Sequence, residues 1–438
     1  MGSTGFFIAA FIIGIFSVFY GQSVDRFVSA FDFYDTSEQL RQVYLNQRLD
    51  SYARFFPLLA VVLLLWAAVL HFHDYLSELK PSVTLFVSIF LVTIVADYFF
   101  STREWIRFGR PCWDYYCTYA QLIYDWLIHA TPAAKENLLS FLATDYHANS
   151  PVGPLLTVAA MLLTKMSAIG AYRLACGLAT LSTLALVRRY LLKPLALDPS
   201  EKWAVMLLLS AHLIVARSFV FPQTDAFVLL WTTALLVCGW AWLERPTWQK
   251  RVGCFFILTS GLFVKLSFLP ALALLPLWKA AQGPRGRPAL VALIKEGAFF
   301  GLLPFVVYRL FQSAFNLTLH YRVELNEMAG KDSNIPYILM SVLHAGLFLG
   351  YLVFIGRREL KRKDFFLLGW IGLYLASLWT ARAAGWDRFY LAILPALAVV
   401  SSAGLSRLKK EWNEGVMWCF VGLYIVVNYA ALWLNLYY

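Results

Sequence analysis

Apolar blocks long enough to cross a lipid bilayer follow one another along the chain, and they restrict its fold more than any other feature. A membrane helix needs about 20 consecutive apolar residues. Blocks of that size cover residues 5–22, 55–73, 82–99, 169–187, 203–220, 225–243, 297–319, 335–355, 365–381, 389–405 and 415–436. Only 14% of the 438 residues are charged, against roughly a quarter in soluble domains. The sequence therefore predicts an all-α polytopic membrane protein.

Basic residues concentrate in short stretches between these blocks. Cationic loops are retained on the cytoplasmic side during membrane insertion, so we predict that all of these stretches are cytoplasmic. Most of the Lys and Arg behind the net charge of +11 lie in loops of this kind, and the charge therefore does not indicate a nucleic-acid partner. The five stretches are 188–202, 244–251, 279–296, 356–364 and 406–414.

The cytoplasmic location of all five basic stretches restricts two other segments. Residues 252–278 have to leave and return to the same side, which predicts a hairpin of two short spans with Lys265 near its tip. The apolar stretch 152–168 then fits a helix in the outer interface. The resulting topology has about 13 transmembrane helices, the N-terminus inside, the C-terminus outside and a long external loop over residues 100–168.

Ionisable residues gather near the predicted external helix ends, while Arg309 and His344 lie closer to the middle of their spans. A charge inside a membrane span is costly and points to function. For any single residue, snorkelling to the interface is the alternative. As a set, these residues predict a cavity open to the outer half of the bilayer and lined by cations with a few carboxylates. The external set is Asp97, Arg173, Arg217, Asp225, Lys265, Arg382 and Arg388.

The long external loop carries two predicted helices. From Trp113 onward, apolar residues recur at helical spacing, which predicts an amphipathic interfacial helix, and a second short helix follows Pro132. Asp114 lies near the start of the first helix, where it serves either as an N-cap or in function. Cys112 and Cys117 can pair if this loop faces an oxidising compartment, and the other four cysteines are expected in the core.

A series of motifs then follows in a recognisable order. They are WDYYCTYA at 113–120, SPVGPLL at 150–156, AYRLACGLATLSTLALVRRYL at 171–191, PQTDAFVLL at 222–230, SGLFVKLSFLPALALLP at 260–276 and DRFYLAILPALAVVSSAGL at 387–405. In this order the chain resembles the lipid-dependent glycosyltransferases of the GT-C class, particularly the branch of the aminoarabinose transferases of lipid A and the protein O-mannosyltransferases. The resemblance implies a GT-C-like catalytic module over 82–405, preceded by extra spans and an external segment in 1–81 and followed by a C-terminal span in 406–438.

The resemblance also implies an activity. Such an enzyme transfers a sugar from a polyprenyl-phosphate donor to a hydroxyl of a glycan, lipid or protein acceptor on the external membrane face. A bacterial inner membrane, and thus the cell envelope, is favoured over the endoplasmic reticulum. Because the leaving phosphate is already a stable anion, one general base suffices. Asp114 occupies the loop position of the family's catalytic acidic residue, and we predict that it is this base.

The remaining roles fall to nearby polar residues. Lys265 and Arg388, followed by Arg382 and Arg173, are the candidates for binding the donor phosphate. Pairing with the adjacent Asp387 is the alternative for Arg388. Asp145 and His147 are candidates for positioning the acceptor or for holding a divalent metal together with Asp114, with ordinary turn chemistry as the alternative. The candidate set as a whole is Asp114, Asp145, His147, Arg173, Lys265, Arg382 and Arg388.

Two other function classes fit the sequence less well. A polysaccharide polymerase or ligase also uses polyprenyl-linked glycans, but it depends on a large external loop late in the chain, whereas here the large loop is early. A secondary transporter is expected to show internal repeats and ionisable groups at the membrane midplane. No repeat is evident in this sequence, and its charges lie toward the outside.

Overall fold

The computed structural model describes most of the chain after residue 115. The described residues are 5–6, 8–13, 60, 63–71, 116–144, 146–212, 214–215, 218, 224–283, 286–315, 335–380 and 387–433. For residues 146–147, 335–345, 379–380, 387–389 and 429–433 the backbone alone is described. The predicted span 82–99 lies outside these ranges.

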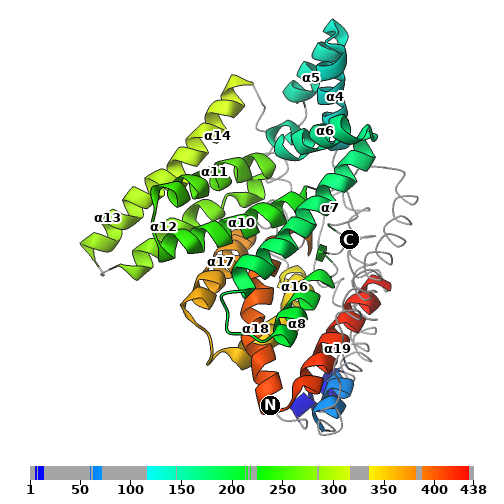
Figure 1. The fold of residues 1–438 in the computed structure, drawn as a ribbon, viewed down its shortest axis with the longest axis vertical. Helices are drawn as coiled ribbons and strands as arrows, with labels where there is room; N and C mark the ends of the chain where they lie inside the picture. The colour runs from blue at the N-terminus through cyan, green and yellow to red at the C-terminus, as the bar shows by residue number, and fades with distance from the viewer. Residues whose placement is uncertain are drawn as a thin grey trace.

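The described residues form helices and contain no strand (Figure 1). The external loop and the segment after it give α4 (Tyr116–His129), α5 (Pro132–Thr144), η3 (Tyr146–Asn149), α6 (Val152–Thr164), α7 (Ala168–Leu186), η4 (Val187–Leu192) and α8 (Pro199–Ser210). The central part gives α10 (Asp225–Glu244), α11 (Trp248–Val264), η5 (Leu266–Phe268), α12 (Ala271–Gln282), α13 (Arg287–Glu296), η6 (Gly297–Leu302) and α14 (Leu303–Ala314). The last part gives α16 (Ile335–Gly356), α17 (Arg362–Thr380), η7 (Asp387–Ile393), α18 (Leu394–Glu411) and α19 (Glu414–Trp433).

Four of the described helices are long and apolar enough to cross a membrane. They are Ala168–Leu192, Asp225–Glu244, Arg287–Ala314 and Tyr390–Glu411. The all-α class is confirmed for the described residues, and these helices agree with a helical membrane protein. The count of about 13 crossings stays a prediction.

The hairpin predicted over 252–278 is present. Helix α11 ends at Val264, Lys265 adopts an extended backbone, and α12 returns after the short turn η5. A Cβ atom on Gly261 would collide with the ring of Phe268, so the absence of a side chain at Gly261 lets η5 fold back closely against α11. Lys265 therefore lies at the tip, as the sidedness argument required.

Three boundaries differ from the prediction. Helix α8 ends at Ser210, although a span was predicted over 203–220; its start is fixed by a capping box between Asp198 and Glu201. The basic stretch 279–296 was predicted as a loop, but its second half is α13, which continues through η6 into α14. Helix α18 likewise extends to Glu411, into the predicted loop 406–414. Basic residues at these ends are compatible with helix, because long cationic side chains reach the interface from a helical backbone.

Both loop helices and the short helix in 152–168 are confirmed as α4, α5 and α6. Tyr116, Tyr119 and Ile123 of α4 are buried as the periodicity predicts, but Trp126 and Leu127 are exposed, so the buried face ends at Ile123. Figure 1 shows α4, α5 and α6 grouped at the end of α7 where that helix begins.

Contacts among the basic stretches show that they meet at one end of the bundle. Lys363 Nζ donates hydrogen bonds to the carbonyl oxygens of Tyr190 (3.3 Å) and Leu191 (3.0 Å), which joins 356–364 to 188–202. Lys363 also interacts electrostatically with Glu244 in 244–251. These contacts hold three basic stretches together.

The other two stretches join the same end. Arg251 forms an ion pair with Glu296 at 3.0 Å, which links 244–251 to 279–296. Arg407 Nη1 donates to the carbonyl of Ile355 at 2.6 Å, and Lys409 contacts Asp198. All five stretches are therefore on one side of the molecule, and we refer to this side as the basic end.

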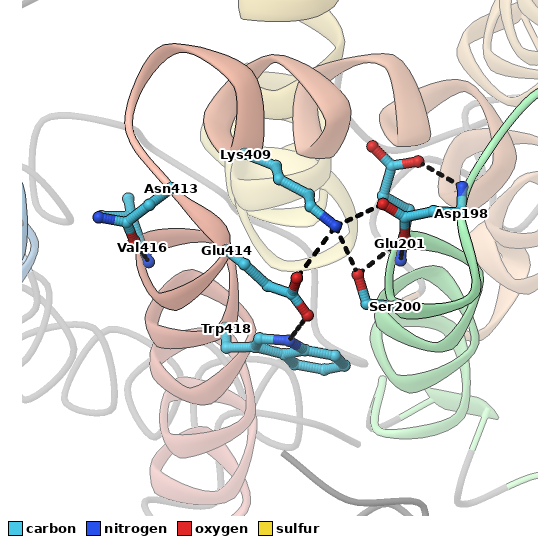
Figure 2. Close-up of polar contacts among 8 residues, drawn as sticks. All are labelled: Asp198, Ser200, Glu201, Lys409, Asn413, Glu414, Val416 and Trp418. Carbon is cyan, nitrogen blue, oxygen red and sulfur yellow. Dashed lines mark hydrogen bonds and ion pairs between the residues drawn. The ribbon is translucent and has the colours of Figure 1, made fainter. Parts of the chain in front are cut away.

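Lys409 is the centre of a polar cluster at the basic end (Figure 2). Its ammonium group contacts the Asp198 carboxylate before α8, the Ser200 hydroxyl at 3.0 Å and the Glu414 carboxylate at the start of α19, also at 3.0 Å. Burial acts to raise the pKa of Asp198, but hydrogen bonds from Lys409, the Glu201 backbone and Ser200 outweigh it and hold the pKa below its ordinary value. One lysine thus ties three helix ends together.

We expect Lys409→Met to lower the free energy of unfolding by about 1 kcal/mol, the upper range for partly exposed ion pairs. The matched control is Lys410→Met, because Lys410 is exposed and makes no ion pair among the described residues. Thermal and denaturant unfolding in mixed micelles measures the difference.

The same cluster carries a pH dependence. Since folding lowers the pKa of Asp198, the ionised carboxylate stabilises the folded protein. This contribution is complete above the ordinary pKa of 3.8 and is lost as the pH falls through the lower pKa of the folded protein.

Equal effects of Lys409→Met and Lys410→Met on unfolding would contradict the role of Lys409.

Helices α16 and α18 cross in direct backbone contact. A Cβ atom on Gly404 would collide with the backbone carbonyl of Leu352, and a Cβ on Gly356 would meet the backbone of Ala403 and Gly404. Small residues permit such close approach between apolar helices. This crossing holds α18, and the segment η7 that leads into it, against the bundle.

Gly404→Ala is expected to destabilise the protein by about 3 kcal/mol or to prevent folding, because backbone atoms cannot move aside as a flexible side chain can. Gly372→Ala on α17 is the control: its Cβ would meet nothing within 4 Å, so it should be neutral or slightly stabilising. Unfolding in detergent measures both variants, and a neutral Gly404→Ala would show that the helices do not touch here.

Candidate functional site

A buried ion pair lies at the end of the bundle away from the basic end. Asp225 is the first residue of α10, and Lys265 is the tip of the α11–α12 hairpin; Lys265 Nζ contacts Asp225 Oδ1 at 2.7 Å. Asp225 is 4% exposed and Lys265 is 8% exposed. Opposite charges attract each other more strongly in such surroundings than in water. Asp225 therefore provides Lys265 with a counter-charge inside the protein.

Two buried oxygen atoms at this pair, one on Asp225 and one on the preceding Thr224, lack a hydrogen-bond partner among the described residues. In the part of the chain that the structure describes, neither Asp225 Oδ2 nor the Thr224 hydroxyl has a hydrogen-bond partner. Thr224 is the N-cap residue of α10, yet its side chain makes no capping hydrogen bond. Burying a polar group without a partner costs about 1–3 kcal/mol. These atoms are therefore available to a ligand that donates hydrogen bonds.

Helix α17 and the segment η7 complete this side of the site. The Tyr374 hydroxyl is hydrogen-bonded to Ser267 of η5, and Tyr374 interacts electrostatically with both Asp225 and Tyr390. Trp370 Nε1 donates to the carbonyl of Ala392 at 3.0 Å, which fixes η7 to α17. The backbone of η7, which includes Arg388, is thereby held close to the start of α10.

Aromatic contacts connect the loop helices to the same place. Tyr116 of α4 stacks on Tyr172 of α7 with ring centroids 6.4 Å apart, and Tyr172 meets Phe227 of α10 edge-on at 5.9 Å. A Cβ on Gly153 of α6 would come within 3.2 Å of both the Tyr172 hydroxyl and the Phe227 ring. The start of α4 and the start of α6 therefore reach within a few side chains of Asp225.

A second polar group joins η3 to α14. Gln312 Nε2 donates to Asn149 Oδ1 at 2.8 Å and to the Tyr308 hydroxyl at 3.1 Å, and Arg309 Nη1 donates to Gln312 Oε1 at 2.9 Å. Phe263, two residues before Lys265, packs on Tyr308 with ring centroids 5.3 Å apart. This amide network and the Asp225–Lys265 pair are thus neighbours.

The structure describes only part of the predicted site. Lys265 is at the centre of the site, and Arg173, which has an interaction partner, follows Tyr172 on α7. His147 and Arg388 have described backbones in η3 and η7, but their side chains lie outside the described atoms, as does that of His344. Their roles stay predictions. Outside the described residues altogether are Asp97, Cys112, Asp114, Asp145, Arg217 and Arg382.

Sequence reasoning placed Asp225 among the external charges but did not pair it with Lys265, and it assigned no role to Thr224, Asn149 or Gln312. A Thr-Asp pair at a helix start is usually a capping signal, and single amides in apolar helices carry no recognisable spacing. Arg309 was placed nearer the membrane middle, yet its hydrogen bond to Gln312 connects it to η3. The sequence signal that could have revealed this network is Gln312, which follows Arg309 by three residues in an apolar span and is therefore on the same side of the helix.

Cys117 is disulfide-bonded, and the other described cysteines, Cys176, Cys238, Cys254 and Cys419, are not in disulfides. The cysteine that pairs with Cys117 therefore lies outside the described residues.

Comparison of the chain with protein-family models, with curated proteins and with solved structures gives no match.

We expect Thr224→Val to raise the free energy of unfolding by about 1 kcal/mol, because it keeps the side-chain shape and removes a buried hydroxyl that has no partner among the residues described. Thr233→Val on the same helix is the control: its hydroxyl donates to the carbonyl of Leu229 at 2.8 Å, so the change should not stabilise. Thermal unfolding in detergent without substrate measures both. A loss of stability in Thr224→Val would mean that its hydroxyl is satisfied.

Proposed function

We propose that this protein transfers a sugar from a polyprenyl-phosphate donor to a hydroxyl of a glycan, lipid or protein acceptor, at the membrane face opposite the basic end. The observation that carries the proposal is the buried Asp225–Lys265 pair, which lies within reach of the helices of the long loop and next to oxygens that have no partner in the described part of the chain. A buried cation beside open hydrogen-bond acceptors suits a ligand that combines phosphate with hydroxyl groups.

Two observations support an external site. The five basic stretches meet at one end, and cationic segments are retained in the cytoplasm. Cys117, on the loop helix α4, is in a disulfide, and disulfides persist in oxidising compartments. In a bacterium both facts support a site at the periplasmic face of the inner membrane.

The proposed chemistry needs few groups. The acceptor oxygen forms a bond to the anomeric carbon, the bond from that carbon to the phosphate oxygen breaks, and the phosphate leaves with the electron pair. The acceptor proton passes to a carboxylate, which we assign to Asp114. Lys265 and Arg388, with Arg382 and Arg173, stabilise the charge on the departing phosphate. Asp145 and His147 position the acceptor or hold a divalent metal with Asp114.

Asp225 acts in this scheme as a positioning residue. It occupies one of the three ammonium hydrogen positions of Lys265 and fixes the direction of the others. Its second oxygen and the Thr224 hydroxyl are suited to hydroxyl groups of the sugar attached to the phosphate. The sugar and its phosphate would then lie on adjacent sides of one ion pair.

We expect Asp114→Asn to reduce sugar transfer by at least about 100-fold, the usual contribution of a general base, while the protein stays folded. Asp125→Asn is the matched control on α4, because Asp125 accepts a hydrogen bond only from Gln121 of its own helix (2.8 Å) among the described contacts. The assay follows release of undecaprenyl phosphate from sugar-linked donors in proteoliposomes supplied with cell-envelope acceptors. Full activity in Asp114→Asn would remove this residue from the mechanism.

A further inference from the structure

Arg309 is a cation on the side of an apolar helix that faces away from the rest of the protein. The candidate span Arg287–Ala314 has only 17% of its most apolar window buried inside the protein. Residues three, four and seven positions before Arg309 lie on its side of the helix. These are Val306, Phe305 and Leu302, and their exposed fractions are 39%, 37% and 62%. The guanidinium therefore stands at the end of an exposed apolar ridge.

Buried amides hold this arginine in place. Gln312, which accepts from Arg309 Nη1, is 4% exposed, and Asn149, which accepts from Gln312, is 1% exposed. Tyr308 fixes the same amide from the preceding turn. An arginine that merely snorkels to the interface needs no such support. A chain of buried hydrogen bonds behind a charged group instead indicates that its direction matters.

The charge of Arg309 is not balanced by a carboxylate in the described part of the chain. Its one described partner is the neutral amide of Gln312, which uses a single donor of the five that a guanidinium offers. A cation at the edge of an apolar face is costly unless an anion meets it. The anion that also covers an apolar ridge is the phosphate of a lipid, because its hydrocarbon chain lies on the ridge.

We propose that Arg309 binds the phosphate of the polyprenyl carrier and that the carrier chain lies along Leu302, Phe305 and Val306. This inference rests on the proposed function for the identity of the lipid. The geometry agrees with it: Leu302 is seven residues, or about 10 Å, closer to the basic end than Arg309. A lipid with its phosphate at Arg309 therefore directs its chain into the membrane.

The position of Arg309 also connects it to the rest of the site. Tyr308 packs on Phe263, and Lys265 is two residues beyond Phe263. Asn149 closes η3, the short helix that contains His147. A phosphate held by Arg309 is therefore on the approach from the lipid to the Asp225–Lys265 pair. Arg309 thus binds the carrier where it enters the site from the membrane, and it is separate from the groups assigned to the transfer step.

The test measures binding of undecaprenyl phosphate to the full-length protein by native mass spectrometry in detergent. We expect Arg309→Gln to weaken binding about ten-fold or more, and Arg309→Lys to weaken it less, because a charged hydrogen bond is lost in the first and a point charge remains in the second. Arg287→Gln, at the other end of the same span, is the matched control and should bind as the unaltered protein does. Thermal unfolding shows that each variant is folded.

Competitors identify the source of the phosphate. Inorganic phosphate and phosphatidylglycerol, each at the concentration of undecaprenyl phosphate, should displace it at least about ten-fold less effectively, since neither provides the isoprenoid chain. Equal displacement by either competitor, or unchanged binding in Arg309→Gln, would overturn the inference. Loss of binding in Arg287→Gln to the same extent would do so as well.

The outcome separates this inference from the proposed function. Binding that depends on Arg309, in a protein that transfers no sugar, would overturn the transferase proposal and leave the lipid site standing. Sugar transfer that depends on Asp114, with binding indifferent to Arg309, would do the reverse. Failure of the unaltered protein to bind undecaprenyl phosphate would overturn both.

Discussion

The cost of holding charge in apolar surroundings determines how both ends of this bundle are built. At the basic end, cations are satisfied by carboxylates or by the free carbonyls at helix ends, as Lys363 is by Tyr190 and Leu191. These carbonyls belong to the π-helical segment η4, the last part of the long helix Ala168–Leu192, where the final carbonyls have no partner within the helix. At the other end, Asp225 and Lys265 satisfy each other. The contacts that neutralise charge are therefore also the contacts that position the helices.

The cluster around Lys409 and the site around Asp225 differ in how completely their polar atoms are satisfied among the described residues. Ion pairs and helix caps account for the groups around Lys409, where the loops need only to be held. Around Asp225, a carboxylate oxygen and a hydroxyl are buried without a partner among the described residues. Leaving them so lowers stability, and proteins tolerate that cost mainly where it serves binding. The contrast with the Lys409 cluster supports the assignment of function to the site around Asp225.

Local sequence patterns predicted much of this architecture. The apolar blocks gave α7, α10, α16 and α19 closely, and the demand that cations stay on one side gave the hairpin with Lys265 at its tip. Spacing cannot show which distant residues meet. Asp225 and Lys265 are 40 positions apart, and Gln312 and Asn149 are 163 apart, so their pairing depends on the packing of helices. The extension of α13 was missed because basic residues indicate the end of a membrane core and not the end of a helix.

Lys265 and Arg309 illustrate two ways of holding a cation, and these suit different ligands. Asp225 pairs with Lys265, and among the described residues its Oδ2 and the Thr224 hydroxyl lack a partner, so this place suits a ligand that brings hydroxyl groups together with its phosphate. Gln312 orients Arg309 without cancelling its charge, so this guanidinium retains its attraction for an anion. A neutral amide therefore leaves Arg309 able to attract the carrier phosphate at the lipid boundary. The arrangement thus favours phosphate capture at Arg309, at the lipid boundary, and recognition of the attached sugar deeper in the protein, beside Thr224 and Asp225.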